Sequence, residues 1–423
     1  MSYPKAWSYI AQNRLPISKQ RVKLLPSTPV TANPGDTVAF QLPSNTMVDL
    51  KSLSINGYLT TATTAGFAVV PFAEAIIEAL GIEINGQMIS ANHAFYNQIF
   101  KLSADLMLGD RISLRKILQL QQDPATIAAP TVNQGAVPFA ITNFLGFLGT
   151  SSCSVIDTSA IGNVRILMRL ASPAILAQSS ACTGPSYSLV TGTSGGALNA
   201  TVDVVDVLDS GTYGQLLQRR LSESPLQINW TDYVAIQGGL SSATQATRFS
   251  VATQSLDAIH ATFLPSDYNV QTGGTVDAYA GSSHYFSRGT NANGGTPSLL
   301  TLTNSFFTFN AQNYPAFGPA LPEEAFLQSM LAWSETQTTL GVCHPKLTTL
   351  ANWVGSLFFH SLRFNVLPSL GETPLLSGIN TTGNTVLSSW TTNGSGTNVL
   401  PLIFLEHTRT MSISAGRQIS IIA

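Results

Sequence analysis

The sequence predicts an all-β protein built from two tandem halves, and three observations lead to that prediction. Short apolar runs recur along most of the chain between clusters of Gly, Pro, Asn and Ser, the pattern of strands and turns in a sandwich or barrel. At 423 residues the chain exceeds the roughly 250–300 residues at which one core stops growing, so about two domains are expected. Residues 47–55 also resemble residues 255–263 at an offset of 208 residues, which indicates an internal repeat.

The strands and helices follow from the apolar periodicity and the turn residues. Expected strands cover residues 37–42, 48–59, 163–170 and 201–208 in the first half, and residues 226–236, 249–264, 301–309, 357–366, 400–407 and 419–422 in the second. Helices should be few and short: a surface helix near residues 93–107, a helix around residues 213–221 that joins the halves, and a helix that begins at Pro322.

The clearest local signal is a hairpin turn at Asn85 and Gly86. These two residues separate two apolar runs within residues 81–89. Both central residues of a type I′ turn need a positive φ, which Asn and Gly tolerate best.

Charge is scarce and unevenly distributed. Charged residues make up 10% of the chain, where about 25% is usual. The formal net charge of −2 excludes a strong overall field toward nucleic acid or anionic lipid. So little surface charge suits a protein that gives much of its surface to neighbours.

The N-terminal residues 1–26 form a basic arm. Five of the 20 basic residues precede the first acid, Asp36, and these are Lys5, Arg14, Lys19, Arg21 and Lys23. Apolar residues interleave with the five cations, as expected of a segment that lies against a membrane surface or nucleic acid. The alternative is a solvated tail that orders on a neighbouring subunit. In either case we expect the arm to contribute no strand to the two halves.

Cysteine usage and hydropathy concern the compartment. The three cysteines are odd in number and far apart, which is poor material for a disulfide framework and fits a reducing cytosol or nucleus. The N-terminus has no continuous apolar core, so no secretory signal is expected. The longest apolar stretch, near residues 136–149, falls short of the roughly 20 residues that a membrane span requires.

Two motifs could indicate an enzyme, and each has a better structural explanation. Residues 192–196 match Gly-x-Ser-x-Gly, but a nucleophile elbow must open a helix, whereas a β-branched run follows here. A flexible loop is therefore expected. Glu323 and Glu324 could be a catalytic carboxylate pair, but directly after Pro322 they complement the positive end of a helix dipole.

Metal and phosphate sites are not supported either. Cys343 and His344 offer two ligands, but the other cysteines lie too far upstream for a zinc set. Asp203, Asp206 and Asp209 lack the Gly-containing loop of an EF-hand, and the alternation of a strand puts the first two on opposite faces. No Gly-rich phosphate loop with its Lys is present. We expect no catalytic residue, no metal and no cofactor.

Several stretches carry a resemblance to a known family. They are residues 35–40 (GDTVAF), 48–52 (VDLKS), 82–86 (IEING) ahead of a helix with Tyr96 and Asn97, and 406–413 (EHTRTMSI). With these stretches the sequence resembles the double jelly-roll major capsid proteins of tailless icosahedral dsDNA viruses, especially polinton-like viruses, adintoviruses and virophages. The resemblance extends diffusely over nearly the whole chain and is clearer in the first half.

The resemblance implies a fold and an assembly that the residue pattern alone leaves open. The expected fold is two tandem eight-stranded antiparallel jelly rolls with a few short helices, forming a trimeric, pseudo-hexameric capsomer. The arm would cover residues 1–26, the first jelly roll residues 27–208, and the linking helix and second jelly roll residues 209–423.

The implied function is that of a structural major capsid protein that trimerises and tiles an icosahedral shell around the genome. The expected partners are copies of the chain itself and neighbouring capsomers, together with penton and minor capsid proteins. The arm would face the interior and contact an internal membrane or packaged DNA. The protein would be located in the virion, after assembly in the host cytoplasm or nucleus.

A second class of function stays open from the sequence. Aromatic residues in the loops of a β-sandwich suit sugars, so the chain could be a carbohydrate-binding or viral attachment protein. Tyr268, Tyr285, Phe286 and Trp390 lie in segments expected to be polar loops and would form such a surface.

Overall fold

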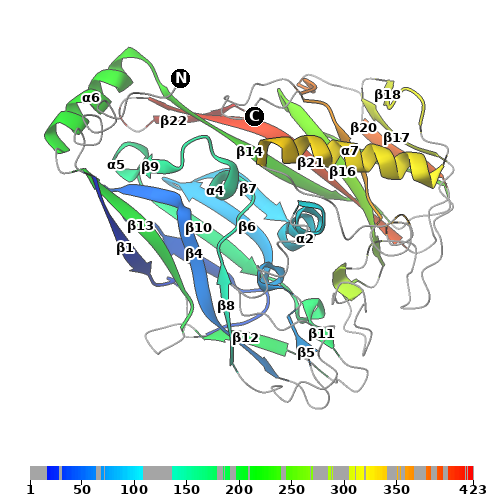
Figure 1. Ribbon diagram of the computed structural model, residues 1–423, viewed down its shortest axis with the longest axis horizontal. Coiled ribbons are helices and arrows are strands. Elements are labelled where there is room, and N and C mark those ends of the chain that lie inside the picture. Colours follow the sequence, from blue (N-terminus) through cyan, green and yellow to red (C-terminus); the bar gives the residue numbers. More distant parts are fainter. Residues whose placement is uncertain are drawn as a thin grey trace, which may run out of the picture.

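The computed structural model describes most of both halves. It covers residues 17–27, 31–62, 68–70, 72–107, 136–178, 184, 186–190, 197–207, 210–239, 244–266, 268–269, 284–286, 288, 304–309, 311–318, 321–340, 350, 353, 358–365, 378–382, 388–393, 399–414, 416 and 418–422. Two β-sandwiches lie side by side along the long axis of the molecule (Figure 1). Every sheet draws its described strands from one side of the helix α6 (Ser210–Glu223).

The first sandwich has two main antiparallel sheets. One sheet has the order β1 (Ile17–Leu24), β13 (Asn199–Val207), β4 (Met47–Ala62), β12 (Ser186–Val190) and β2 (Thr31–Ala32), with β8 (Ala136–Ile141) and β9 (Val155–Asp157) also pairing with β4. The facing sheet has the order β3 (Thr37–Gln41), β10 (Val164–Leu170), β6 (Ile77–Ile84) and β7 (Gln87–Ala94). A short pair joins β11 (Ala177–Gln178) to β5 (Ala68–Val69).

The second sandwich repeats this arrangement. One sheet has the order β14 (Leu226–Gln237), β21 (Val399–Ser414), β16 (Leu256–Pro265) and β19 (His360–Arg363), with β22 (Gln418–Ile422) added on β21. The other has the order β15 (Thr244–Phe249), β20 (Ser388–Asn393), β17 (Asn304–Phe309) and β18 (Gln312–Tyr314). The strand expected over residues 249–264 forms only from Leu256 onward, as β16, and Phe249 is instead the last residue of β15 in the other sheet.

The two halves share one strand order, which confirms the prediction of two tandem jelly rolls. The four-stranded sheets have the spatial orders β3-β10-β6-β7 and β15-β20-β17-β18. In each sheet the strand that comes first along the chain pairs with the strand that comes last, and that strand also pairs with the second along the chain. The path β1-β13-β4 corresponds in the same way to β14-β21-β16. Residues 47–55 and 255–263, which resemble each other in sequence, thus lie in equivalent strands, β4 and β16.

The start of the first roll differs from the expectation for the arm. Residues 17–24 form β1, which pairs with β13 over eight residue positions, from Ile17 opposite Val207 to Leu24 opposite Ala200. The prediction that the whole arm lies outside the rolls is therefore wrong for this segment. Its cations alternate with Val22 and Leu24, and Leu24 packs against the first core, so the segment is an amphipathic strand.

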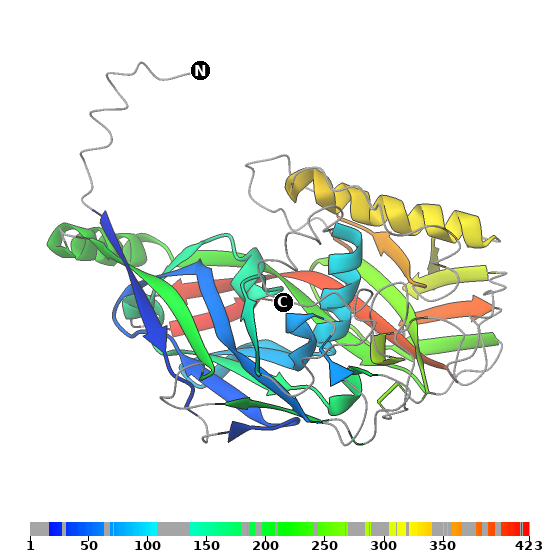
Figure 2. The ribbon, with the colours of Figure 1, turned by 60° about the horizontal axis from the view of Figure 1, so that its bottom comes forward.

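The helix expected near residues 93–107 forms as α2 (Tyr96–Met107), but it is not a surface helix. Tyr96 and Phe100 belong to the core of the first roll, whereas Ile99 and Leu102 belong to that of the second. In both views α2 stands between the two sandwiches (Figures 1 and 2). The apolar spacing revealed one buried face, and the second roll covers the other side of the helix.

Six shorter or peripheral helices complete the described structure. They are α4 (Phe147–Thr150), α5 (Thr158–Ile161), α7 (Pro322–Leu340), and the 3-10 turns η1 (Ala73–Ile76), η4 (Pro173–Ile175) and η5 (His284–Phe286). None of the helices in the described part of the chain is long and apolar enough to cross a membrane.

The strands β14 and β21 form one ribbon that belongs to both cores. They pair over twelve positions, from Leu226 opposite Ile413 to Gln237 opposite Leu402. One end of the ribbon contributes Ile228, Trp230, Met411 and Ile413 to the first core, and the other end contributes Phe404 and Leu405 to the second. The two rolls are thus tied together by a shared element of regular structure and not only by the link through α6.

Removal of residues 1–25 is expected to destabilise the protein, because it deletes β1 and exposes the edge of β13. A chain that lacks residues 1–16 keeps β1 and is the matched comparison. The apparent unfolding temperature and the soluble yield of the two deletions would measure the effect. Equal stability of the two chains would contradict a structural role for β1.

Candidate functional site

The hairpin turn at Asn85 and Gly86 joins β6 to β7. Ile84 pairs with Gln87, and the two turn residues have φ values of +50° and +81°. Asn85 also reaches the loop before β10: its Nδ2 donates to the carbonyl of Ile161 at 2.8 Å, and its Oδ1 accepts from the backbone N–H of Asn163 at 3.0 Å. The turn therefore holds a neighbouring loop as well as the hairpin.

Two cations of the arm are paired with acids on the outer face of the first roll. Lys19 Nζ lies 2.7 Å from Asp49 Oδ2, and Arg21 Nε lies 2.8 Å from Asp203 Oδ1. The hydrogen bond from Lys19 to Asp49, together with the charge of that carboxylate, raises the pKa of Lys19. Both pairs are solvent-exposed and hold β1 to β4 and β13 only weakly. They also neutralise part of the positive charge that the sequence places on the arm.

The other sequence-predicted groups do not converge on a site. Asp206 is exposed and Asp203 is paired with Arg21. Among the described residues, no cluster of three or more His, Cys, Asp or Glu could hold a metal ion. Glu323 and Glu324 are exposed in the first turn of α7. Five of the groups considered from the sequence lie outside the described residues, namely Lys5, Arg14, residues 192–196, Asp209 and the pair Cys343 and His344.

The aromatic residues considered for sugar binding are mostly buried. Tyr285, Phe286 and Trp390 are 3%, 1% and 1% exposed, and Trp390 lies within the strand β20 and not in a loop. Tyr268 is partly buried and packs against Tyr285 with ring centroids 5.4 Å apart. The expectation of an exposed surface is wrong for Tyr285, Phe286 and Trp390, because their large apolar rings fill the cores.

The junction between the rolls combines apolar packing with backbone hydrogen bonds. Phe147 of α4 meets Trp230 of β14 edge to face, with centroids 5.4 Å apart. Thr150 Oγ1 accepts from the N–H of Thr231 at 3.0 Å and donates to its carbonyl at 3.1 Å. Two residues on, Ser152 N–H donates to the carbonyl of Asn229 at 2.8 Å. The end of α4 and the residues that follow it thus hydrogen-bond to backbone groups on the edge of β14, as a further strand would.

A charged pair lies inside the same junction. Arg409 of β21 places Nη1 3.1 Å from Asp232 Oδ2 of β14, and the same nitrogen donates to the carbonyl of Ile89 in β7 at 3.0 Å. Ser90 Oγ donates to Asp232 Oδ1 at 3.0 Å. Asp232 is 1% exposed, so its charge depends on Arg409 for compensation. The pair therefore connects the second roll to the first through buried groups.

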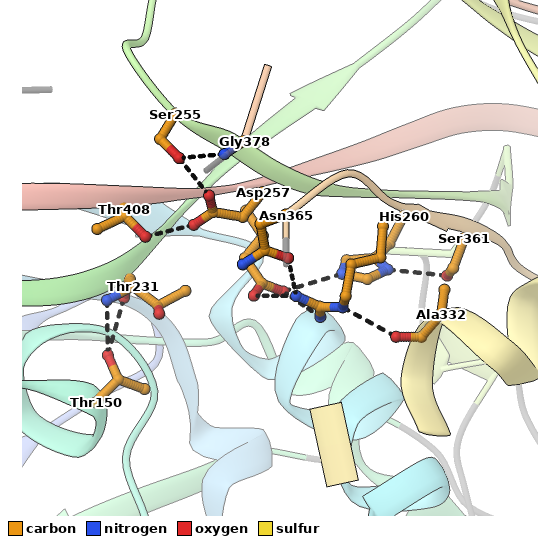
Figure 3. A network of polar contacts seen from close by, with 12 residues as sticks. Thr150, Thr231, Ser255, Asp257, His260, Ala332, Ser361, Asn365, Gly378 and Thr408 are labelled. Atoms are coloured by element: carbon orange, nitrogen blue, oxygen red, sulfur yellow. Dashed lines mark hydrogen bonds and ion pairs between the residues drawn. The ribbon is translucent and has the colours of Figure 1, made fainter. Parts of the chain in front are cut away.

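A larger buried polar network lies in the second roll (Figure 3). Glu406 of β21 accepts from Arg363 of β19 through both oxygens, at 3.3 and 3.4 Å. Arg363 also donates to the carbonyl of Ala332 at 3.0 Å and to Asn365 Oδ1 at 3.1 Å. Burial opposes ionisation of Glu406, but the charge of Arg363 and a hydrogen bond from His260 outweigh it and lower the pKa of Glu406 to about 2.

Beside this pair, Ser361, His260 and Glu406 are arranged as a hydrolase triad would be. Ser361 Oγ lies 2.9 Å from His260 Nδ1, and His260 Nε2 lies 3.3 Å from Glu406 Oε2. Both Ser361 and His260 are 0% exposed, so no acyl substrate can reach the hydroxyl. Burial lowers the pKa of His260. The arrangement can fix the packing of three strands but cannot perform acyl transfer.

The same Trp-Ser-His arrangement occurs twice in the second roll. Trp333 Nε1 donates to Ser361 Oγ at 3.1 Å beside His260, and Trp390 Nε1 donates to Ser305 Oγ at 3.1 Å beside His360. Ser305 Oγ lies 2.7 Å from His360 Nδ1. Burial lowers the pKa of His360 to about 3. Both histidines are therefore neutral side chains that satisfy buried hydroxyl groups near neutral pH.

Asp257, at the bulge of β16, closes the network on its other side. Ser255 donates to its Oδ1 at 2.6 Å and Thr408 to its Oδ2 at 2.5 Å. Burial raises the pKa of Asp257 to about 6, although both hydrogen bonds oppose the rise. Asp257 corresponds to Asp49 of the first roll in the repeated sequence, so the equivalent acid is partly buried and paired with Lys19 in one roll and fully buried in the other.

Comparison with known proteins agrees with this architecture. No protein-family model and no curated protein sequence matches the chain. Among solved structures, a chain of the PBCV-1 virus capsid matches with a TM-score of 0.62 at 14% identity, covering 100% of this chain and 98% of that one. The Faustovirus major capsid protein matches with a TM-score of 0.61 at 10% identity, covering 95% of this chain and 91% of that one. The described part of the chain therefore has the double jelly-roll fold of these proteins.

The substitution Arg409→Ala is expected to lower the free energy of unfolding by about 3–5 kcal/mol, because it leaves the buried Asp232 carboxylate uncompensated. Arg219→Ala is the matched control: its pair with Glu223 is exposed on α6, and its loss should cost less than about 1 kcal/mol. Denaturant unfolding followed by tryptophan fluorescence would measure both. Equal losses would show that the charged pair does not stabilise the junction.

Acid should destabilise the fold through His360. Its folded-state pKa of about 3 lies below the ordinary value of 6.5, so its contribution is complete above pH 6.5 and is lost as the pH falls toward 3. Between pH 7 and pH 5 this amounts to about 2 kcal/mol. The free energy of unfolding of the parent and of His360→Gln would be measured at pH 7 and pH 5. It should decrease less in the variant. Between pH 7 and pH 8.5 the difference in free energy of unfolding between the two proteins should stay constant. An equal decrease in both proteins at pH 5 would show that His360 is not the source of the acid destabilisation.

Proposed function

We propose that the chain is a structural major capsid protein whose copies trimerise and tile an icosahedral virion shell around a genome. The observation that carries this proposal is the pair of jelly rolls with one strand order, joined by the ribbon of β14 and β21. Three such chains bring six similar rolls into one ring, and a ring of six similar units has the near-hexagonal outline that can tile a closed shell. The fold shared with the PBCV-1 and Faustovirus capsid proteins supports the same function.

The proposal divides the chain near α6. The first jelly roll would end near residue 208, and residues 209–423 would supply the linking helix and the second roll. The start of the first roll moves from residue 27 to residue 17, because β1 pairs with β13 and takes the place that β14 has in the second roll. The basic arm proper then comprises residues 1–16.

The arm would face the interior of the shell and contact an internal membrane or packaged DNA. Its charge is smaller than the sequence suggests, because Lys19 and Arg21 are paired with Asp49 and Asp203. The contact would depend on Lys23, which is exposed on β1, and on Lys5 and Arg14. Counterion release by so few cations predicts weak, salt-sensitive binding.

Further partners and the location follow from a shell protein of this kind. Neighbouring capsomers, penton proteins and minor capsid proteins would contact the trimer, and the protein would be located in the virion after assembly in the host cytoplasm or nucleus. The chain would act without catalysis or a cofactor. Burial of Tyr285, Phe286 and Trp390 removes the surface on which the carbohydrate-binding alternative depended.

Sedimentation velocity and negative-stain electron microscopy of the purified full chain would test the proposal. A species with three times the 44.9 kDa chain mass and a near-hexagonal outline is expected. The same sample applied to a glycan array tests the alternative. A chain that stays monomeric up to about 100 µM, far above the dissociation constant of an interface of ordinary strength, would overturn the trimer proposal. Specific glycan binding by such a monomer would favour the attachment class.

A further inference from the structure

Two surfaces at opposite ends of the molecule are complementary in both charge and hydrophobicity. One surrounds α7 and is called the α7 patch; its exposed apolar residues are Phe317, Leu321, Leu327 and Leu331. The other is the outer face of α6, where Leu216 is 61% exposed. In Figures 1 and 2 the two helices lie toward opposite ends of the long axis, α6 on the first roll and α7 on the second.

The apolar residues of the α7 patch are not part of the core. Ala325, Ser329 and Trp333 face the second roll and are buried, which fixes the inward side of the helix. Leu327 and Leu331 are one turn apart on the other side and are 60% and 62% exposed. Phe317, just before the helix, is 91% exposed. Large apolar side chains gathered in this way mark an interaction surface more often than single exposed leucines do.

The charges of the two helices are opposite. The helix α7 contains Glu323, Glu324 and Glu335 and no Lys or Arg. The helix α6 contains Arg219 and Arg220 with one acid, Glu223, which pairs with Arg219 at 3.1 Å. Two copies that met through α7 alone would bring their acids together, and two copies that met through α6 alone would bring their arginines together. A contact between α6 of one copy and α7 of another avoids both repulsions.

We propose that α6 of one copy docks on the α7 patch of a second copy of this chain, head to tail. Leu216 would lie among Leu321, Leu327 and Leu331, and Arg220 would lie near Glu323 at the start of α7. A contact between two different surfaces repeats from copy to copy, and it closes into a ring when the rotation between copies allows. This inference rests on the proposed function and names the surfaces that close the trimer.

Charge reversal provides the sharpest test, because each side can be changed without touching a core. Arg220→Glu and Glu323→Lys, each made alone in the full chain, should weaken trimerisation at least tenfold in sedimentation equilibrium. The double variant restores opposite charges across the contact and should recover most of the affinity. Circular dichroism and thermal unfolding of each variant confirm that the monomer is folded.

The apolar half of the contact has its own variant and control. Leu327→Ser with Leu331→Ser should shift the protein toward monomer, whereas Met88→Ser, which removes a partly exposed side chain from β7, should not. Trimerisation of all these variants with the affinity of the parent would overturn the docking of α6 on α7 and leave the proposed function standing. A parent that is itself monomeric would overturn the proposed function and this inference together.

Discussion

The ribbon of β14 and β21 is the constraint on which the rest of the structure depends. At about 3.3 Å per residue its twelve paired positions extend roughly 40 Å, which is long enough to cross from one core into the other. Trp230 and Met411 fill the first core, while Phe404 and Leu405 fill the second. Because the same two strands are buried at both ends, the rolls cannot rotate against each other without losing apolar contacts on both sides.

The buried charges add specificity to this frame more than stability. Removing ions from water is costly, and pairs such as Asp232 with Arg409 recover the cost only when their geometry is satisfied. Each pair joins particular strands: Asp232 and Arg409 fix β14 and β21 against β7, and Glu406 and Arg363 fix β21 against β19. An altered strand register would leave a buried charge without its partner. The polar groups therefore favour one arrangement of the apolar sandwiches over the others that similar hydrophobicity would allow.

The sequence was informative where the signal is local or repeated. Asn85 and Gly86 identified the hairpin, because few residue pairs accept two positive φ values. The similarity of residues 47–55 to residues 255–263 identified the repeat, and these residues lie in the equivalent strands β4 and β16. Local patterns misled where pairing is distant. The strand β1 looked like a tail because its partner β13 lies far along the chain, and α2 looked half-exposed because its second cover is the other roll. The grouping of His260, Ser361 and Glu406 depends on the register of three strands that are remote in sequence.

The same distant pairings determine the order in which the molecule can be completed during synthesis. At roughly 5–20 residues per second, Val207 leaves the ribosome about 10–40 s after Ile17, its partner across β1 and β13. During that interval Lys19, Arg21 and Lys23 discourage β1 from pairing with another nascent chain, as charged residues do on open sheet edges. The first core still lacks Met411 and Ile413, which come from β21. The core of the first roll can therefore be completed only after β21 of the second roll has been synthesised.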